Sequence, residues 1–122
     1  MKHSVILSIG SNHKAEINMQ RTHEMLGKVM TDTRFTGIIE TEDSEGGGDS
    51  FLNQMALGDT EMPFAAFRAY TKKLESILGR TPKRKAYGII DIDIDILMYD
   101  NQTYKEDDWM TDHVQQLVKE LS

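Results

Sequence analysis

The sequence predicts an α+β fold in which four strands and two helices follow one another in the order β-α-β-β-α-β. Two segments place apolar residues at three- and four-residue steps, the spacing of an amphipathic helix. Four other segments are rich in β-branched residues, which indicates strands. This order is typical of the split βαβ, or ferredoxin-like, arrangement, an antiparallel sheet with both helices on one face.

The first half of the chain supplies three of the strands and one helix. Residues 4–9 are expected to form a buried strand that ends in a turn at 10–12, where glycine and asparagine tolerate unusual backbone angles. Residues 16–30 follow as a helix whose methionines fill the core. The β-branched residues of 34–41 and 51–57 predict two more strands.

A long loop is expected between the second and third strands. Residues 42–50 hold three consecutive glycines and four acidic residues, which cannot pack into a core. Long loops in compact domains are often functional, so this segment is a candidate functional loop.

The second half contains the clearest helix of the chain. Pro63 stands at a favourable first helical position, and an apolar stripe runs from there to Gly79. A basic loop at 80–87 and a strand at 88–99 come next. Residues 101–122 begin as a polar turn and end as a short helix.

Length and charge restrict the possible functions. With 122 residues the chain fits one domain, 1–122. Its net charge is −6, from 20 acidic and 14 basic residues, and no long basic stripe is present, so nucleic acid is a poor partner. Cysteine is absent, and no apolar run is long enough for a secretion signal or a membrane span. We therefore expect a cytoplasmic protein, and the sequence leaves its oligomeric state open.

Three aspartates alternate with isoleucines in the last predicted strand. A period of 2 places Asp91, Asp93 and Asp95 on one face and Ile92, Ile94, Ile96 and Met98 on the other. Like charges about 7 Å apart repel one another, and a divalent cation bound by oxygen ligands would offset that repulsion. A solvated edge strand is the alternative, but aspartate is depleted in strands, which favours a metal site.

The basic residues concentrate in one short stretch, Arg80 and Lys83-Arg84-Lys85. A solvated loop is the usual meaning of such a stretch. In an acidic domain it is also a candidate site for a phosphorylated ligand.

Several short motifs together resemble the 6-hydroxymethyl-7,8-dihydropterin pyrophosphokinase family over roughly residues 5–101. The motifs are Ile9-Gly10-Ser11-Asn12, Glu40-Thr41, Phe51-Leu52-Asn53, Glu75 before Gly79-Arg80, and Tyr87-Gly88 followed by Asp-Ile-Asp-Ile-Leu-Met-Tyr. The resemblance implies a ferredoxin-like fold and transfer of the β,γ-diphosphate of ATP to the pterin hydroxymethyl group, a step of folate biosynthesis. ATP, a pterin and two magnesium ions are then the expected ligands.

The resemblance also implies roles for individual residues. Asp93 and Asp95 match the two aspartates that hold magnesium, and Asn53 matches the asparagine that binds the pterin ring. Thr41 and Phe51 match residues beside that ring. Asp91 lies outside the aspartate pair, and we expect a solvated acid there more than an added ligand.

The nucleotide positions follow from the same comparison. Arg80 and Lys83 match basic residues that contact the ATP phosphates, Arg80 being also a catalytic residue. Glu75 matches a helix residue beside the nucleotide and the metal, and Tyr87 stands where a tryptophan is frequent. His113, 18 residues after Asp95, matches a histidine that touches the triphosphate.

The sequence departs from the family at three places. Ile89 and Ile90 stand where the family has proline and a catalytic arginine, the loop 42–50 is acidic instead of proline-rich, and the segment after His113 is short. These departures leave two alternatives open. One is a degenerate paralogue that binds a pterin or nucleotide without turnover, and the other is a small metal-binding ferredoxin-like module.

Overall fold

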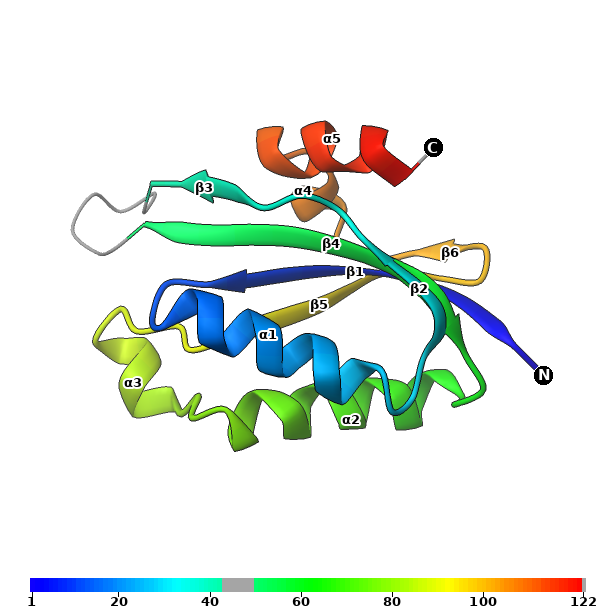
Figure 1. Cartoon of the computed structure of the whole chain (residues 1–122), viewed down its shortest axis with the longest axis horizontal. Helices are drawn as coiled ribbons and strands as arrows, with labels where there is room; N and C mark the ends of the chain where they lie inside the picture. The colour runs from blue at the N-terminus through cyan, green and yellow to red at the C-terminus, as the bar shows by residue number, and fades with distance from the viewer. Residues whose placement is uncertain (43–49, 122) are drawn as a thin grey trace.

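The computed structural model describes residues 1–42 and 50–121 (Figure 1). Its elements, in chain order, are β1 (His3–Ser11), α1 (Ala15–Leu26), β2 (Thr31–Phe35), β3 (Ile39–Thr41), β4 (Phe51–Thr60), α2 (Phe64–Ile77), α3 (Pro82–Ala86), β5 (Asp93–Tyr99), β6 (Gln102–Thr103), α4 (Glu106–Trp109), α5 (Asp112–Val118) and the 3₁₀ turn η1 (Lys119–Leu121). The predicted α+β class is confirmed.

The strands form one six-stranded sheet in which every pair is antiparallel. Its order is β2-β4-β1-β5-β6, and β3 pairs with β4 on the same edge as β2. The first strand of the chain is therefore central, between β4 and β5.

The predicted second strand, 34–41, is interrupted and forms β2 and β3. Thr36, between them, still exchanges two hydrogen bonds with Met55, from Thr36 N to Met55 O and from Met55 N to Thr36 Oγ1, each 2.9 Å. The next amide, Gly37 N, donates instead to Glu120 Oε1 at 2.8 Å. The C-terminal turn thus holds the sheet edge where the strand breaks.

Helices α1 and α2 cover one face of the sheet (Figure 1). Alternate residues of the central strands face these helices, as the period of 2 requires. The main core is built from buried apolar residues of both layers: Val5, Leu7, Ile9, Met19, Leu26, Phe67, Leu74, Ile94 and Ile96. Two helices on one face agree with the sequence prediction.

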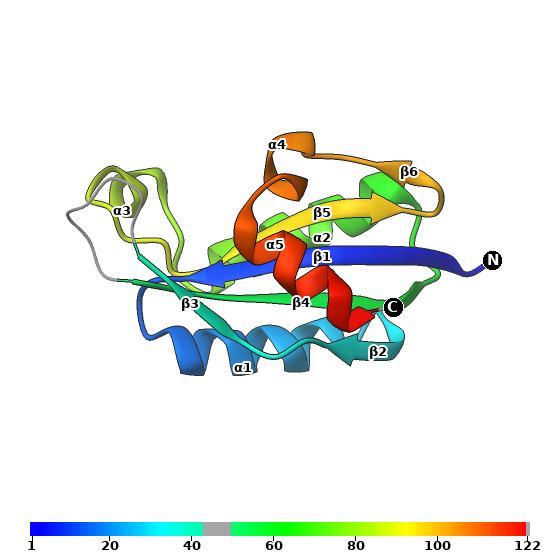
Figure 2. The ribbon, with the colours of Figure 1, turned by 90° about the horizontal axis from the view of Figure 1, so that it is seen from above.

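The short C-terminal helix α5 lies against the opposite face, where Figure 2 shows it crossing the strands. Val114 and Leu117 of α5 are buried there with Ile6, Met55 and Leu97 of the sheet. A C-terminal helix was expected, but its place on this face was not. Because of it, the sheet has a covered second face beside which a cavity can form.

The predicted apolar face of the last strand is correct for Ile92, Ile94 and Ile96, which are buried in the main core. It is wrong for Met98, which packs on the other side with the α5 cluster. The cause is a shift in the β1–β5 register between Ile6 and Leu7, which breaks the alternation beyond Ile96.

Two further expectations need correction. The helix expected over 16–30 ends at Leu26, followed by a turn that starts at the weak helix former Gly27. The basic stretch, predicted as a loop, contains the helix α3. Pro82 occupies its first turn, and Thr81 caps it by accepting a 3.1 Å hydrogen bond from Arg84 N.

Most of the predicted long loop 42–50 lies outside the described residues. In the part of the chain that is described, no helix has the length and apolar content needed to cross a bilayer.

Candidate functional site

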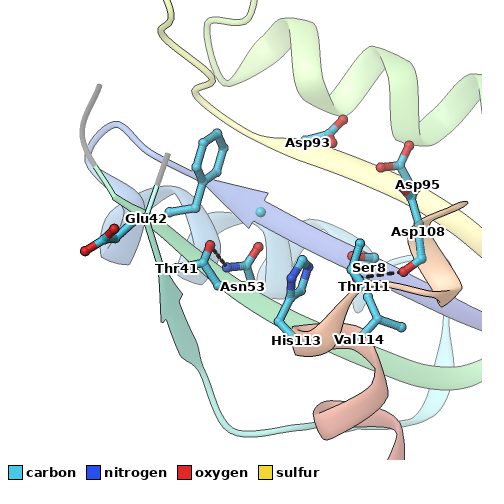
Figure 3. Close-up of a pocket in the computed structure, with 12 residues that line it drawn as sticks. Ser8, Thr41, Glu42, Asn53, Asp93, Asp95, Asp108, Thr111, His113 and Val114 are labelled. Carbon is cyan, nitrogen blue, oxygen red and sulfur yellow. Dashed lines mark hydrogen bonds between the residues drawn. The ribbon is translucent and has the colours of Figure 1, made fainter. Parts of the chain in front are cut away.

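A cavity of about 410 Å³ lies on the same face of the sheet as α5 (Figure 3). Its lining residues are Ser8, Gly10, Thr41, Glu42, Phe51, Asn53, Asp93, Asp95, Asp108, Thr111, His113 and Val114. Six of the ten predicted site residues are among them, and they come from β3, β4, β5 and α5. The volume is within the usual range for small-molecule sites.

Gly10 lines the cavity floor, the part of β1 that lies between β4 and β5. In the sheet it pairs with Asn53 on one side and with Asp93 on the other. A Cβ atom at this position would lie 3.5 Å from Asn53 Oδ1, so it would fit its neighbours but occupy the floor. Glycine therefore keeps open the space between the amide and the carboxylate.

The Asn53 side chain is held in one orientation. Its Nδ2 donates to Thr41 Oγ1 at 2.8 Å and to Ile39 O at 3.2 Å (Figure 3). Both amide protons are used by these acceptors, so Oδ1 is left to accept a hydrogen bond from a ligand N–H. The predicted pterin residues Thr41, Phe51 and Asn53 thus lie at one end of the cavity.

Asp93 and Asp95 point into the other end from the same face of β5 (Figure 3). Burial and the nearby negative charge of Asp93 raise the pKa of Asp95 to about 7. Lys105 Nζ, 3.8 Å from Asp95 Oδ1, opposes this shift only in part. The pair thus carries more negative charge than its surroundings compensate, a condition that a proton or a cation relieves.

Arg80 already has carboxylate partners. Its Nη1 donates to Asp93 Oδ1 at 2.7 Å and lies 3.2 Å from Glu75 Oε2. Partial burial lowers the pKa of Arg80, but the hydrogen bond to Asp93 and the surrounding carboxylates outweigh it and raise the pKa. Glu75 is buried and also accepts a 2.8 Å hydrogen bond from Ile94 N. Glu75 therefore fixes Arg80 and β5 relative to α2.

A second cavity, of about 550 Å³, adjoins the first and shares Asp93, Asp95 and Asp108 with it. Its other lining residues are Lys72, Arg80, Lys85, Lys105, Glu106 and Asp107. The sequence placed Lys85 only in the basic stretch as a whole, and it did not identify Lys72, Lys105 or Asp108. They come from three separate elements, and only the fold brings them beside the two aspartates.

Asp91 does not belong to the aspartate face. It precedes β5, is only 3% exposed, and receives 2.8 Å hydrogen bonds from Nε and Nη2 of Arg84. That pairing lowers the pKa of Asp91 below its usual value, against the effect of burial. The expectation of three carboxylates on one face is wrong, and so is the expectation of a solvated acid.

Of the three remaining predicted site residues, one lines the first cavity and two lie outside both cavities. His113 lines the first cavity, and burial lowers its pKa while Asp108 and Asp112 act in the opposite sense. Lys83 is exposed on α3 and does not line either cavity. Tyr87 is 76% exposed and also lies outside both.

Comparison with known proteins agrees with this geometry. A family model described as 7,8-dihydro-6-hydroxymethylpterin-pyrophosphokinase (HPPK) matches residues 6–120 of the 122-residue chain. The chain belongs to this family. A search of curated proteins gives no match. The HPPK match extends the resemblance, expected over 5–101, through the C-terminal helix and His113.

Enzymes of the HPPK family generally use Mg²⁺ together with ATP. Among residues 1–42 and 50–121, no three His, Asp or Glu side chains are arranged to hold a metal ion. Two carboxylates on one strand face are nevertheless what Mg²⁺ commonly takes from a protein, with water and phosphate oxygens as its other ligands. Asp93 and Asp95 fit that partial role.

Proposed function

We propose that this HPPK-family protein transfers diphosphate from ATP to 6-hydroxymethyl-7,8-dihydropterin. The observation that carries the proposal is the first cavity, where Asn53 and Thr41 lie across Gly10 from Asp93 and Asp95. A pterin ring at the Asn53 end of the cavity would direct its hydroxymethyl group toward Asp93 and Asp95.

The reaction requires little covalent chemistry from the protein. The pterin hydroxymethyl oxygen forms a bond to the β-phosphorus of ATP, the bond from that phosphorus to the α,β-bridging oxygen breaks, and the hydroxyl proton is released. AMP leaves with the bridging oxygen. Catalysis of such a transfer depends on positioning and on stabilising the charge of the phosphoryl oxygens.

Each end of the cavity offers a distinct contribution. Asn53 Oδ1, fixed by Thr41, would accept an N–H of the pterin ring and so orient the hydroxymethyl group. His113, with its lowered pKa, is available as a neutral hydrogen-bonding group at the wall. Asp93 and Asp95 would hold Mg²⁺, which when bound gathers phosphate oxygens and neutralises their charge.

The order of the strands also supports a ferredoxin-like topology, as the family resemblance implies. The four longer strands follow the order β5-β1-β4-β2, with α1 and α2 on one face. This is consistent with the expected ferredoxin-like arrangement, to which β3, β6 and the C-terminal helices are additions.

Binding without turnover is the second candidate. It is favoured by Arg80, which is engaged by Asp93 and Glu75, and by Ile90 at the position of the family's arginine. One lost transition-state cation commonly costs two to three orders of magnitude in rate, roughly 3 to 4 kcal/mol. If the protein instead retains slow turnover, Ile90→Arg should raise its rate, and no gain from Ile90→Arg would favour binding without turnover.

The test is AMP formation in the presence of ATP, Mg²⁺ and the hydroxymethyldihydropterin. We expect formation that requires both the pterin and Mg²⁺, is lost in Asp95→Asn, and is slower than the roughly 1 to 100 per second of ordinary kinases. Binding of both ligands without AMP would favour the second candidate. Calorimetry showing no binding of either a pterin or a non-hydrolysable ATP analogue would overturn both.

A further inference from the structure

The basic stretch provides four cations, and the structure separates them by their partners. Arg80 is engaged by Asp93 and Glu75, and Arg84 is bound through two nitrogens to the buried Asp91. Both guanidinium groups therefore have structural partners. The two lysines are the remaining candidates for binding an anion.

Lys83 and Lys85 point to different sides of α3. Residues two apart on a helix are separated by about 200° around its axis. Lys85 lines the second cavity and also a neighbouring groove of about 450 Å³ beside α2, whereas Lys83 lines neither. Within the described residues, no ion pair is made by Lys85. Its ammonium group is available at the cavity wall.

Two further lysines face the second cavity from other elements. Lys72 comes from α2 and lies 3.4 Å from Glu75 Oε1, and Lys105 precedes α4 and lies 3.8 Å from Asp95 Oδ1. Both side chains are well exposed, so they can turn toward a ligand. With Lys85 they form a cationic wall, defined as Lys72, Lys85 and Lys105, around Asp93 and Asp95.

The cavity also contains the acids of α4, so its charge is mixed. Four cations, Arg80 and the three lysines of the cationic wall, stand against five carboxylates. A free polyanion would be repelled by those carboxylates, whereas a polyphosphate chain accompanied by divalent cations would satisfy both sets of charges.

We propose that the cationic wall, with Lys85 in place of Lys83, contacts the polyphosphate chain of the nucleotide. The proposal rests on the proposed function and deepens it, because it names the residues of this chain that replace the missing arginine. Three lysines from three elements would then supply the charge that the family places before its aspartate strand.

The experiment compares Lys85→Ala, Lys83→Ala and Lys73→Ala by calorimetry with Mg²⁺ and two probes, a non-hydrolysable ATP analogue and inorganic tripolyphosphate. Each variant removes one exposed lysine charge, and Lys73 adjoins Lys72 on α2 but lines neither the second cavity nor the groove. We expect Lys85→Ala to lower the affinity for both probes about tenfold and to make that affinity less dependent on salt. Lys85→Arg should restore most of the affinity. Lys83→Ala and Lys73→Ala should stay within about twofold of wild type.

Equal losses of affinity in all three alanine variants would show only a general charge effect and would overturn the proposal. A loss of affinity in Lys83→Ala alone would restore the sequence-based prediction that Lys83 contacts the ATP phosphates. The failures of the two proposals are distinguishable. Lys85-dependent binding of tripolyphosphate without AMP formation contradicts the proposed function alone, and pterin-dependent AMP formation unaffected by Lys85→Ala contradicts the cationic wall alone.

Discussion

The Arg80 guanidinium donates a 2.7 Å hydrogen bond to the carboxylate of Asp93 at the boundary between the two cavities. The same carboxylate is a candidate magnesium ligand. A metal ion and Arg80 therefore compete for Asp93, and a phosphate would give the released guanidinium a new partner.

Arg80→Ala is predicted to change metal and nucleotide binding in opposite directions. Without the guanidinium, Asp93 is free, so Mn²⁺ or Mg²⁺ alone should bind a few-fold more tightly. The non-hydrolysable ATP analogue with Mg²⁺ should bind about tenfold more weakly, because a phosphate contact is lost. Calorimetric titrations with and without the analogue measure both, and Arg80→Lys serves as the control that keeps the charge. Weaker binding of both the metal ion and the ATP analogue would contradict the competition between Arg80 and the metal for Asp93.

Asp91 and Asp93 are predicted to have separable roles, although they are two residues apart. Asp91→Ala leaves Arg84 without its partner and should lower the urea midpoint of unfolding while keeping the Mg²⁺ affinity. Asp93→Ala should weaken Mg²⁺ binding with a smaller effect on stability, since Asp93 is partly exposed. Urea unfolding and a magnesium titration of both variants check this. Weaker Mg²⁺ binding in a folded Asp91→Ala protein would make Asp91 a ligand after all.

The raised pKa of Asp95 predicts a specific pH dependence of stability. Between its ordinary value of 3.8 and about 7, the folded state holds a proton that the unfolded state has lost. The stability from this group is therefore present in full below pH 3.8 and is lost as the pH rises through about 7. In thermal unfolding without metal, Asp95→Asn should be more stable than wild type above pH 7, and the difference should shrink toward pH 4.

The effect of Mg²⁺ on thermal stability tests the same carboxylate, Asp95. Since Mg²⁺ requires the ionised carboxylate, it should raise the melting temperature of wild type more at pH 8 than at pH 5, and should do little for Asp95→Asn. A magnesium effect that is equal at both pH values, or equal in both proteins, would separate Asp95 from the metal.

Gly10→Ala is predicted to affect the ligand and not the fold. The new methyl group would lie in ordinary contact with Asn53 Oδ1, 3.5 Å away, so the urea midpoint should change little. It would occupy the cavity floor, so the affinity for the hydroxymethyldihydropterin should fall about tenfold. Fluorescence or calorimetric titration of the pterin gives the readout, with Mg²⁺ binding as the internal control. Unchanged pterin affinity would show that the ligand does not lie over Gly10.

The sequence predicted the fold class because its helices and strands have strong periodic patterns. The family resemblance of short motifs implied site roles for Thr41, Phe51, Asn53, Asp93, Asp95 and His113, which the fold brings to one cavity. The place of α5 on the second face could not be predicted, since the amphipathic pattern of a short helix shows which of its sides is buried but not which face of the sheet it covers. Lys85 could not be distinguished from Lys83 within the basic stretch, nor Lys105 from other surface lysines, because only tertiary packing brings α3 and the turn before α4 beside β5.

The repeat of β5 has a consequence for folding accuracy. Isoleucine and aspartate alternate from Asp91 to Ile96, so sliding the strand by two residues would return isoleucine to the core and aspartate to the cavity. Within the repeat, hydrophobic burial therefore cannot tell the two alignments apart. Beyond the repeat the slide is costly, because it would move Asp95 to the buried position of Leu97. Contacts before the strand also oppose it, since Arg84 binds the Asp91 carboxylate and Ser11 Oγ donates to Asp91 O at 2.6 Å. These flanking contacts, and not the repeat itself, select which two of the three aspartates enter the cavity.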